Sequence, residues 1–195
     1  MKSYCSRRTA LVRLLALILV ASIADALTVR ADEPAPKRSQ ARYEVGFMTM
    51  MIDHHNMAIM MAMLCEGRTV HPELQQMCND IITAQQAEIM EMQGWLNDWY
   101  SVQHEPVMKP KDERMLARLA ALSGEEFEVA FMTEMIKHHS IALVRARQCQ
   151  KRAFHGELTA MCQMMEEAQT AEIAQMREWL CQWYQKCRGS GQSDR

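Results

Sequence analysis

The sequence predicts an all-α protein, a four-helix bundle assembled from two duplicated helix hairpins and a long helical connector. Apolar residues recur at steps of three and four through most of the chain, which is the spacing of one helix face. The 195 residues include only seven glycines and five prolines, and strand-forming runs of Val, Ile and Thr are scarce. Residues 47–100 align without a gap to residues 131–184, with about half of the positions identical, so one hairpin is repeated.

The N-terminus has the pattern of a secretory signal. Basic residues precede an apolar run at residues 14–24, which is too short to span a bilayer well. Either Ala24-Asp25-Ala26 or Val29-Arg30-Ala31 fits a signal-peptidase site. We expect residues 1–31 to be removed, which predicts a periplasmic or secreted protein without stable membrane insertion. The remaining chain has 17 Lys and Arg against 23 Asp and Glu, a net charge of −6. This negative charge argues against nucleic acid as a partner.

The first hairpin is expected over residues 41–103, after a polar, proline-rich leader at 32–40 that we expect to be disordered. Its first helix should run to about Arg68. Pro72 then occupies a favourable first-turn position for the second helix. That second helix has the clearest period of the chain, with a bundle-facing seam that places Gln85 and Glu88 in its middle. Buried polar groups are costly unless they have partners, so this seam indicates a polar site inside the bundle.

The connector is expected over residues 104–124, with a short amphipathic helix at 111–122. Its length allows it to cross the bundle, as in ferritin-like folds. The second hairpin should cover residues 125–187, followed by a disordered polar tail at 188–195.

A paired-histidine motif occurs once in each hairpin and suggests a soft-metal site. Met51-Ile52-Asp53-His54-His55 returns 84 residues later as Met135-Ile136-Lys137-His138-His139. Imidazole and thioether groups suit soft or borderline metals, Cu(I) above all. On a helix, residues three and four positions apart are neighbours, so Met51, His54 and His55 can serve one ion. The predicted metal ligands are Met48, Met51, His54, His55, Met61 and Met92 in the first hairpin and Met135, His138 and His139 in the second.

The two hairpins differ in their methionine content. Many methionines of the first helix are replaced in the second hairpin, for example Met50 by Glu134 and Met61 by Arg145. We therefore expect the first hairpin to hold the metal, and Met57, Met60 and Met63 are further candidates as exposed surface ligands. Glu88 is expected to accept a hydrogen bond from an imidazole and fix its tautomer.

The combined motif Met-x-x-His-His-x-x-Ala and Gln-x-x-Glu-Ile-x-x-Met-x-x-Trp-Leu resembles the family named domain of unknown function 305. It reads Met51 to Ala58 and Gln85 to Leu96 in the first hairpin, and Met135 to Ala142 and Gln169 to Leu180 in the second. The resemblance implies a ferritin-like bundle that is usually exported, with some members implicated in copper or silver binding, and it implies no enzymatic activity. The family often has methionine at the position of Met61.

The residues leave several functions open. The first is an exported protein that sequesters, buffers or hands over Cu(I), or Ag(I), with a copper transporter or cuproprotein as its partner. The second is a structural or interaction bundle in which the histidines are satisfied by Gln85 or Glu88 within a methionine-rich core. The third is a metal-dependent oxidase. A di-iron centre of the ferritin type is excluded, since it needs Glu-x-x-His motifs that neither hairpin contains.

The cysteines also leave alternatives open. Cys65 and Cys78 flank the first hairpin turn, and Cys149 and Cys162 flank the second. In an oxidising compartment such pairs suggest disulfides. The alternatives are a thiolate–imidazole metal site with His71 or His155, or buried free thiols. Cys181 and Cys187 have no counterparts in the first hairpin.

Overall fold

The computed structural model describes residues 33–187. The expected signal segment 1–31 and tail 188–195 lie outside these residues. Four long helices and one short helix account for most of the described chain. They are α2 (Arg38–Ala62), α3 (Pro72–Tyr100), α4 (Pro110–Ala120), α5 (Gly124–Arg152) and α6 (Gly156–Tyr184), with a 3-10 turn η1 (Met63–Cys65) after α2.

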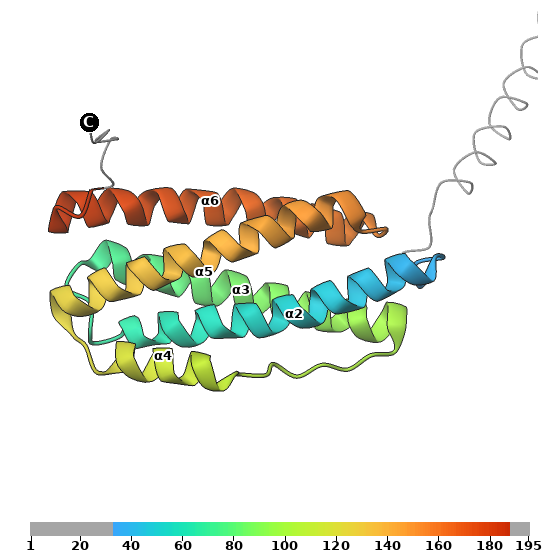
Figure 1. The fold of residues 1–195 in the computed structure, drawn as a ribbon, viewed down its shortest axis with the longest axis horizontal. Coiled ribbons are helices and arrows are strands. Elements are labelled where there is room, and N and C mark those ends of the chain that lie inside the picture. Colours follow the sequence, from blue (N-terminus) through green and yellow to red (C-terminus); the bar gives the residue numbers. More distant parts are fainter. Residues whose placement is uncertain (1–32, 188–195) are drawn as a thin grey trace, which may run out of the picture. The chain divides into compact units, whose positions relative to one another are not determined.

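The long helices form two antiparallel hairpins, α2–α3 and α5–α6, and α2 packs on α5 between them. Figure 1 shows how the connector links the two hairpins. It leaves the end of α3, runs back along the bundle as an extended segment and α4, and enters α5 at the opposite end. α4 contacts both α2 and α5. This crossing connection confirms the predicted all-α, ferritin-like bundle.

The first helix differs from its expected range at both ends. α2 begins at Arg38, and Ala35 before it is buried, so the expected disorder of residues 32–40 does not hold there. α2 ends at Ala62, although the sequence predicts Arg68, because the chain tightens into the 3-10 turn η1 and then turns at Gly67, which has a φ of +69°. Glycine takes this left-handed conformation without steric cost. In the second hairpin Lys151 occupies the equivalent position, and α5 continues to Arg152.

The hydrophobic core consists of two clusters, and each one draws on both hairpins. One cluster joins Met48, Met51 and Met92 to residues of α5 and α6 that include Ala142 and Met165. The other joins Met57 and Met61 of α2 to Met132, Met135 and Met176. Burying one such side chain contributes about 1.5–3 kcal/mol relative to leaving it exposed. The hairpins therefore share one core and do not fold around separate ones.

Two buried carboxylates connect each hairpin to the end of the other. Glu44 of α2 accepts hydrogen bonds from the backbone N–H groups of Phe154 (2.6 Å) and His155 (2.9 Å), at the start of α6. It also contacts His155 Nδ1 at 2.6 Å and accepts the Tyr100 hydroxyl at 2.5 Å. The residue before α6 offers no side-chain cap of its own, so this carboxylate satisfies the free N–H groups and complements the helix dipole.

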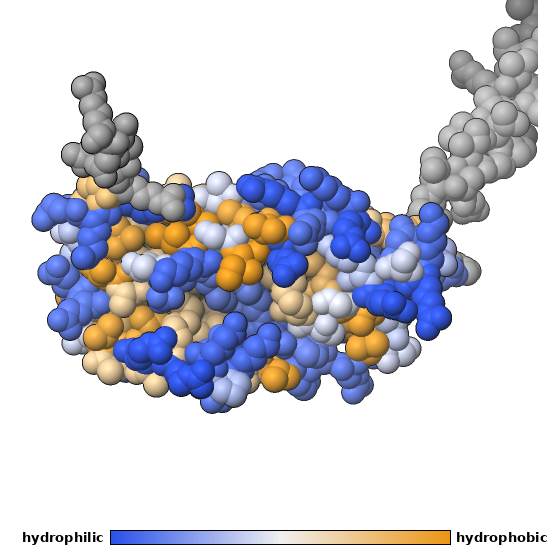
Figure 2. Space-filling view, in the orientation of Figure 1, coloured by the Kyte–Doolittle hydropathy of each residue, from blue (hydrophilic) through white to orange (hydrophobic). Residues whose placement is uncertain are grey.

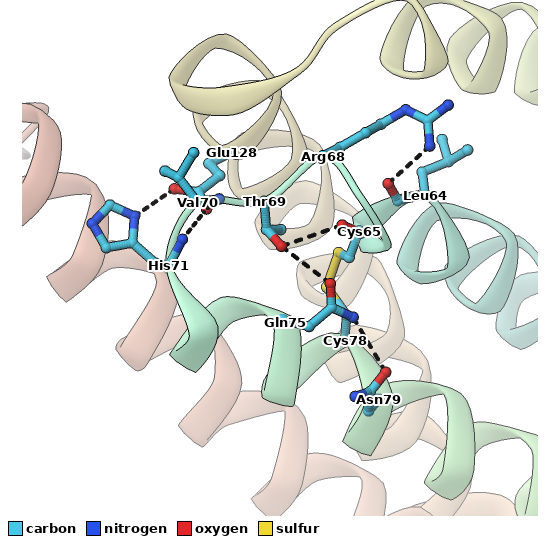
Figure 3. Close-up of a disulfide and its surroundings, with 10 residues drawn as sticks. All are labelled: Leu64, Cys65, Arg68, Thr69, Val70, His71, Gln75, Cys78, Asn79 and Glu128. Carbon is cyan, nitrogen blue, oxygen red and sulfur yellow. Dashed lines mark hydrogen bonds and ion pairs between the residues drawn. A yellow bond between two sulfur atoms is a disulfide. The ribbon is translucent and has the colours of Figure 1, made fainter.

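Glu128 of α5 repeats the arrangement at the start of α3. It accepts the N–H groups of Val70 (2.7 Å) and His71 (2.9 Å), contacts His71 Nδ1 at 2.7 Å, and accepts the Tyr184 hydroxyl. Figure 3 shows Glu128 beside His71 at the first hairpin turn. Both carboxylates lie three residues before the compared segments, at the same 84-residue separation, so extending the comparison would have found them.

The four hairpin-turn cysteines form disulfides. Cys65 bonds to Cys78, with Cα atoms 6.5 Å apart, and Cys149 bonds to Cys162 at 6.2 Å. Figure 3 shows the first bridge at the hairpin turn, close to Thr69 and Gln75. A third bridge joins Cys181, in the last turn of α6, to Cys187, which lies beyond the end of that helix. The alternative thiolate–imidazole sites are therefore absent. The four hairpin-turn cysteines are oxidised, and His71 and His155 contact the carboxylates of Glu128 and Glu44.

Candidate metal centre

The two histidine motifs meet where α2 and α5 contact each other. The rings of His54 and His138 lie face to face, with centroids 3.6 Å apart and planes tilted by 31°. The sequence placed both residues on bundle-facing rows, but it could not show that they face each other. They occupy equivalent positions in the two hairpins, so the contact lies at the internal pseudo-twofold axis.

Three of the four ring nitrogens of these two imidazoles are buried without a hydrogen-bond partner. They are both nitrogens of His54 and the Nδ1 of His138. Burial, followed by the neighbouring His55 and His139, lowers the pKa of His54 to about 3. Burial and the facing His54 hold the pKa of His138 well below its usual range. Both rings are thus neutral at neutral pH and present nitrogen lone pairs, the form in which histidine binds metals.

The second histidine of each motif contacts a glutamate. His55 Nε2 lies 2.7 Å from Glu88 Oε2, and His139 Nε2 lies 2.7 Å from Glu172 Oε2, although the second pair is not oriented as a hydrogen bond. The expected contact of Glu88 with an imidazole is present. Because Nε2–H of His55 points to the carboxylate, its lone pair lies on Nδ1, which is buried and unpartnered.

A pocket of about 310 Å³ opens onto the facing histidines. Its lining includes His54, His138, Met50 and Met57, and it is bounded by the connector at Val107 and Lys109. Asp53 holds the connector in place by accepting hydrogen bonds from the Val107 N–H (2.9 Å) and from His104 Nε2 (2.8 Å). The pocket thus combines two neutral imidazoles with two thioethers. Met50 was not among the sequence candidates, because nothing in the sequence shows which α2 residues face the connector.

The other predicted methionine ligands are divided between the two core clusters. Met48, Met51 and Met92 belong to the cluster near the start of α2, while Met61 and Met135 belong to the other. All five are fully buried. The predicted ligands Met51 and Met61, two turns or more apart on α2, therefore belong to different clusters. Helical spacing puts Met51 and Met61 on one face of α2, and this face contributes to both clusters.

The expectation of three exposed methionines is correct for Met60 of α2 and Met63 of η1 and wrong for Met57. Met57 is buried, whereas Met60 and Met63 are 37% and 57% exposed. Figure 2 shows hydrophobic side chains reaching the surface among hydrophilic ones on one face of the protein. Within residues 33–187, no group of three His, Cys, Asp or Glu side chains is arranged to hold a metal ion. A metal at this centre would therefore need thioether ligands beside the imidazoles.

No helix in the described part of the chain combines the length and hydrophobicity that a bilayer span requires.

Solved structures with the same architecture include copper- and silver-bound forms of CopM. Its Cu(I)-bound structure matches with a TM-score of 0.65 and 30% identity, covering 72% of this chain and 97% of CopM. The Cu(II)-bound form matches with a TM-score of 0.66 and 31% identity, with the same coverage. An Ag-bound form matches with a TM-score of 0.64 and 30% identity. A DUF305 protein from Streptomyces coelicolor matches with a TM-score of 0.63 and 25% identity, covering 71% of this chain and 92% of that protein.

A shorter match joins this chain to the uncharacterized protein L153 of Acanthamoeba polyphaga mimivirus. The two are 42% identical over 52 residues, which is 27% of this chain and about a third of that protein, at 34%. The model of the family described as "Domain of unknown function (DUF305)" matches residues 44–180, a stretch that includes both histidine motifs and both hairpins. The chain belongs to the DUF305 family.

Proposed function

We propose that this protein binds Cu(I), and also Ag(I), at the facing histidines His54 and His138, and that it sequesters, buffers or hands over the ion. The observation that carries the proposal is the set of buried ring nitrogens without partners. A buried polar group without a partner costs about 1–3 kcal/mol, so a protein that keeps several of them in one place needs a reason. A soft metal ion supplies the missing partner.

The pocket lining combines soft ligands with charged side chains, namely the carboxylates Asp53 and Asp112 and the cations Lys109, Lys111 and Arg145. Thioethers from Met50 and Met57 line the pocket together with the two imidazoles. Neutral nitrogen and sulfur ligands favour Cu(I) and Ag(I) over harder ions. Copper- and silver-bound structures of CopM, a relative with the same fold, support this choice of metal.

The site joins the two hairpins and does not belong to the first one alone. Each hairpin contributes one histidine, and the pocket thioethers come from α2, since Met50 and Met57 correspond to Glu134 and Ile141 in α5. The remaining predicted ligands are all buried, namely Met48, Met51, His55, Met61, Met92, Met135 and His139. The proposed function is binding, with no catalytic step.

Export remains part of the proposal. The N-terminal segment has the signal pattern, and three disulfides favour an oxidising compartment such as the periplasm or the extracellular space. A periplasmic copper transporter or cuproprotein would then be the natural recipient of the ion.

Titration with Cu(I) against a competing chelator tests the proposal, with ascorbate as a reductant that leaves the disulfides intact. The double variant His54→Ala, His138→Ala should lose the high-affinity site. His104→Asn is the matched control, because His104 lies on the connector and has a carboxylate partner. If the double variant competes for Cu(I) as well as the unmodified protein does, the proposed centre is wrong.

A further inference from the structure

The surface between α2 and α3 contains a second group of thioethers, away from the facing histidines. A groove of about 1090 Å³ runs between these two helices and is closed at one side by the connector at Glu105 and Pro106. Three methionines line it. Met60 is 37% exposed, Met63 57% and Met90 60%, so their sulfur-bearing side chains reach solvent.

Packing does not account for these three side chains. Met60 and Met63 lie three residues apart and are therefore neighbours on one face, and Met90 comes from the facing helix α3. Large apolar side chains exposed together raise the risk of aggregation, and monomeric proteins usually avoid such clusters. Met60, Met63 and Met90 are three of the four methionines with large exposed area in the described chain, and the fourth, Met164, lies on α6.

The second hairpin shows what the same surface looks like without thioethers. Val144, Arg147 and Ala174 replace Met60, Met63 and Met90. Arg147 Nε lies 2.6 Å from Glu166 Oε1, and Glu166 occupies the position of Ile82, which lines the groove in the first hairpin. The two helices are thus close enough at this level for side chains to bridge them. An ordinary salt bridge serves the second hairpin here, and the first hairpin has soft ligands in its place.

The charge of the groove suits a cation. Its lining, all within the described residues, contains Glu66 and Glu105 and no Lys, Arg or His. The other polar side chains of the lining are amides, among them Gln86 and Gln93. The thioethers do not titrate, so they bind a soft ion over a wide pH range.

From this arrangement we infer a second, solvent-facing metal site in which Met60, Met63 and Met90 bind Cu(I) or Ag(I). The site goes beyond the proposed histidine centre and does not rest on it. Consecutive connector residues separate the two sites, since Glu105 and Pro106 line the groove and Val107 lines the histidine pocket. A soft ion can be captured at the groove from solvent, whereas the histidine centre lies beneath the connector.

The test uses Ag(I), which binds thioethers and needs no reductant, so the disulfides stay intact. The full chain is labelled with carbon-13 at the methionine methyl groups and titrated with silver nitrate, and the methyl resonances are followed by NMR. Resonances of Met60, Met63 and Met90 should shift, while that of Met164, which is 58% exposed on α6, should not. If the three groove resonances stay in place while other methionines respond, the inference is overturned.

A variant set separates this site from the histidine centre. Met60→Leu, Met63→Leu and Met90→Leu together keep the side-chain volume and should lower the number of Ag(I) ions bound per chain, whereas Met164→Leu should not. Unchanged stoichiometry in the triple variant would refute the groove site. The variant His54→Ala, His138→Ala should retain the groove shifts. If it loses them, the groove is no independent site. If it keeps them and also keeps full Ag(I) stoichiometry, the histidine centre fails and the groove stands.

Discussion

The carboxylate of Glu44 offers the sharpest test of how the two hairpins are held together. Replacing Glu44 with alanine leaves four donors without their acceptor, namely the N–H groups of Phe154 and His155, His155 Nδ1 and the Tyr100 hydroxyl. A hydrogen bond to a charged group contributes about 1.5–3 kcal/mol, so simple addition would give about 6–12 kcal/mol. Hydrogen bonds that share one acceptor are not additive, so this sum is an upper bound.

A better guide is the cost of breaking a buried charged pair, about 3–5 kcal/mol, and we expect Glu44→Ala to lower the free energy of unfolding by that amount. Glu44→Gln should cost less, about 1.5–3 kcal/mol, since one acceptor oxygen remains. The assay is urea unfolding followed by far-UV circular dichroism, with the disulfides intact. Glu91→Ala, at an exposed position of α3, is the control and should stay within about 0.5 kcal/mol of the unmodified protein. If Glu44→Ala costs less than about 1 kcal/mol, the carboxylate does not hold the hairpins together and the reasoning is wrong.

Three further predictions concern pH, the disulfides and the connector. Burial raises the pKa of Glu44, but its hydrogen bonds from Tyr100 and His155 outweigh burial and place the pKa below its ordinary value. The ionised Glu44 carboxylate therefore stabilises the fold above the pKa of the unfolded state, and this stabilisation is lost as pH falls through the pKa of the folded state. Between about pH 5 and pH 3 the free energy of unfolding should thus fall more for the unmodified protein than for Glu44→Gln. Replacing Cys149 and Cys162 with serine opens a loop of 13 residues and should cost about 3 kcal/mol in unfolding measured without reductant; a cost near zero would mean that the bridge does not constrain the unfolded chain. Asp53→Ala removes the acceptor of the Val107 N–H and should speed hydrogen exchange at that amide, while Asp98→Ala, on the exposed side of α3, should not.

Much of the fold follows from local patterns in the sequence. Periodicity, together with Pro72 at a helix start, correctly predicts four long helices, and the 84-residue repeat correctly predicts two hairpins. The contact of Glu88 with a histidine is also foreseeable, because both residues lie on bundle-facing rows of adjacent helices. The end of α2 differs from the expected one, because the periodic pattern continues to Cys65 through the 3-10 turn η1, where the α-helix has already ended.

The candidate site was less predictable than the fold. Helical spacing tells which residues share a face, but not which neighbouring helix that face meets. It therefore grouped Met51 with Met61, which the structure divides between two clusters, and it gave no sign that His54 meets His138. Met50 and Met57 line the histidine pocket because the connector closes it beside them. The path of the connector cannot be predicted from spacing, since it is an extended segment without a periodic pattern. Such contacts between distant parts of the chain are set by the packing of the whole bundle.

The reciprocal carboxylate caps have a consequence for any chain that contains only one hairpin. Glu44 and Glu128 each serve a helix of the opposite hairpin, and His54 and His138 each need the other. In a solitary hairpin, the glutamate would have no helix N-terminus to accept hydrogen bonds from, and the histidine ring would have no second imidazole facing it. It could complete both contacts only by pairing with a second copy of itself, in an isologous dimer where each contact occurs twice. The fused chain makes that pairing intramolecular and so independent of concentration, and it leaves the two halves free to diverge, one toward thioethers and the other toward salt bridges.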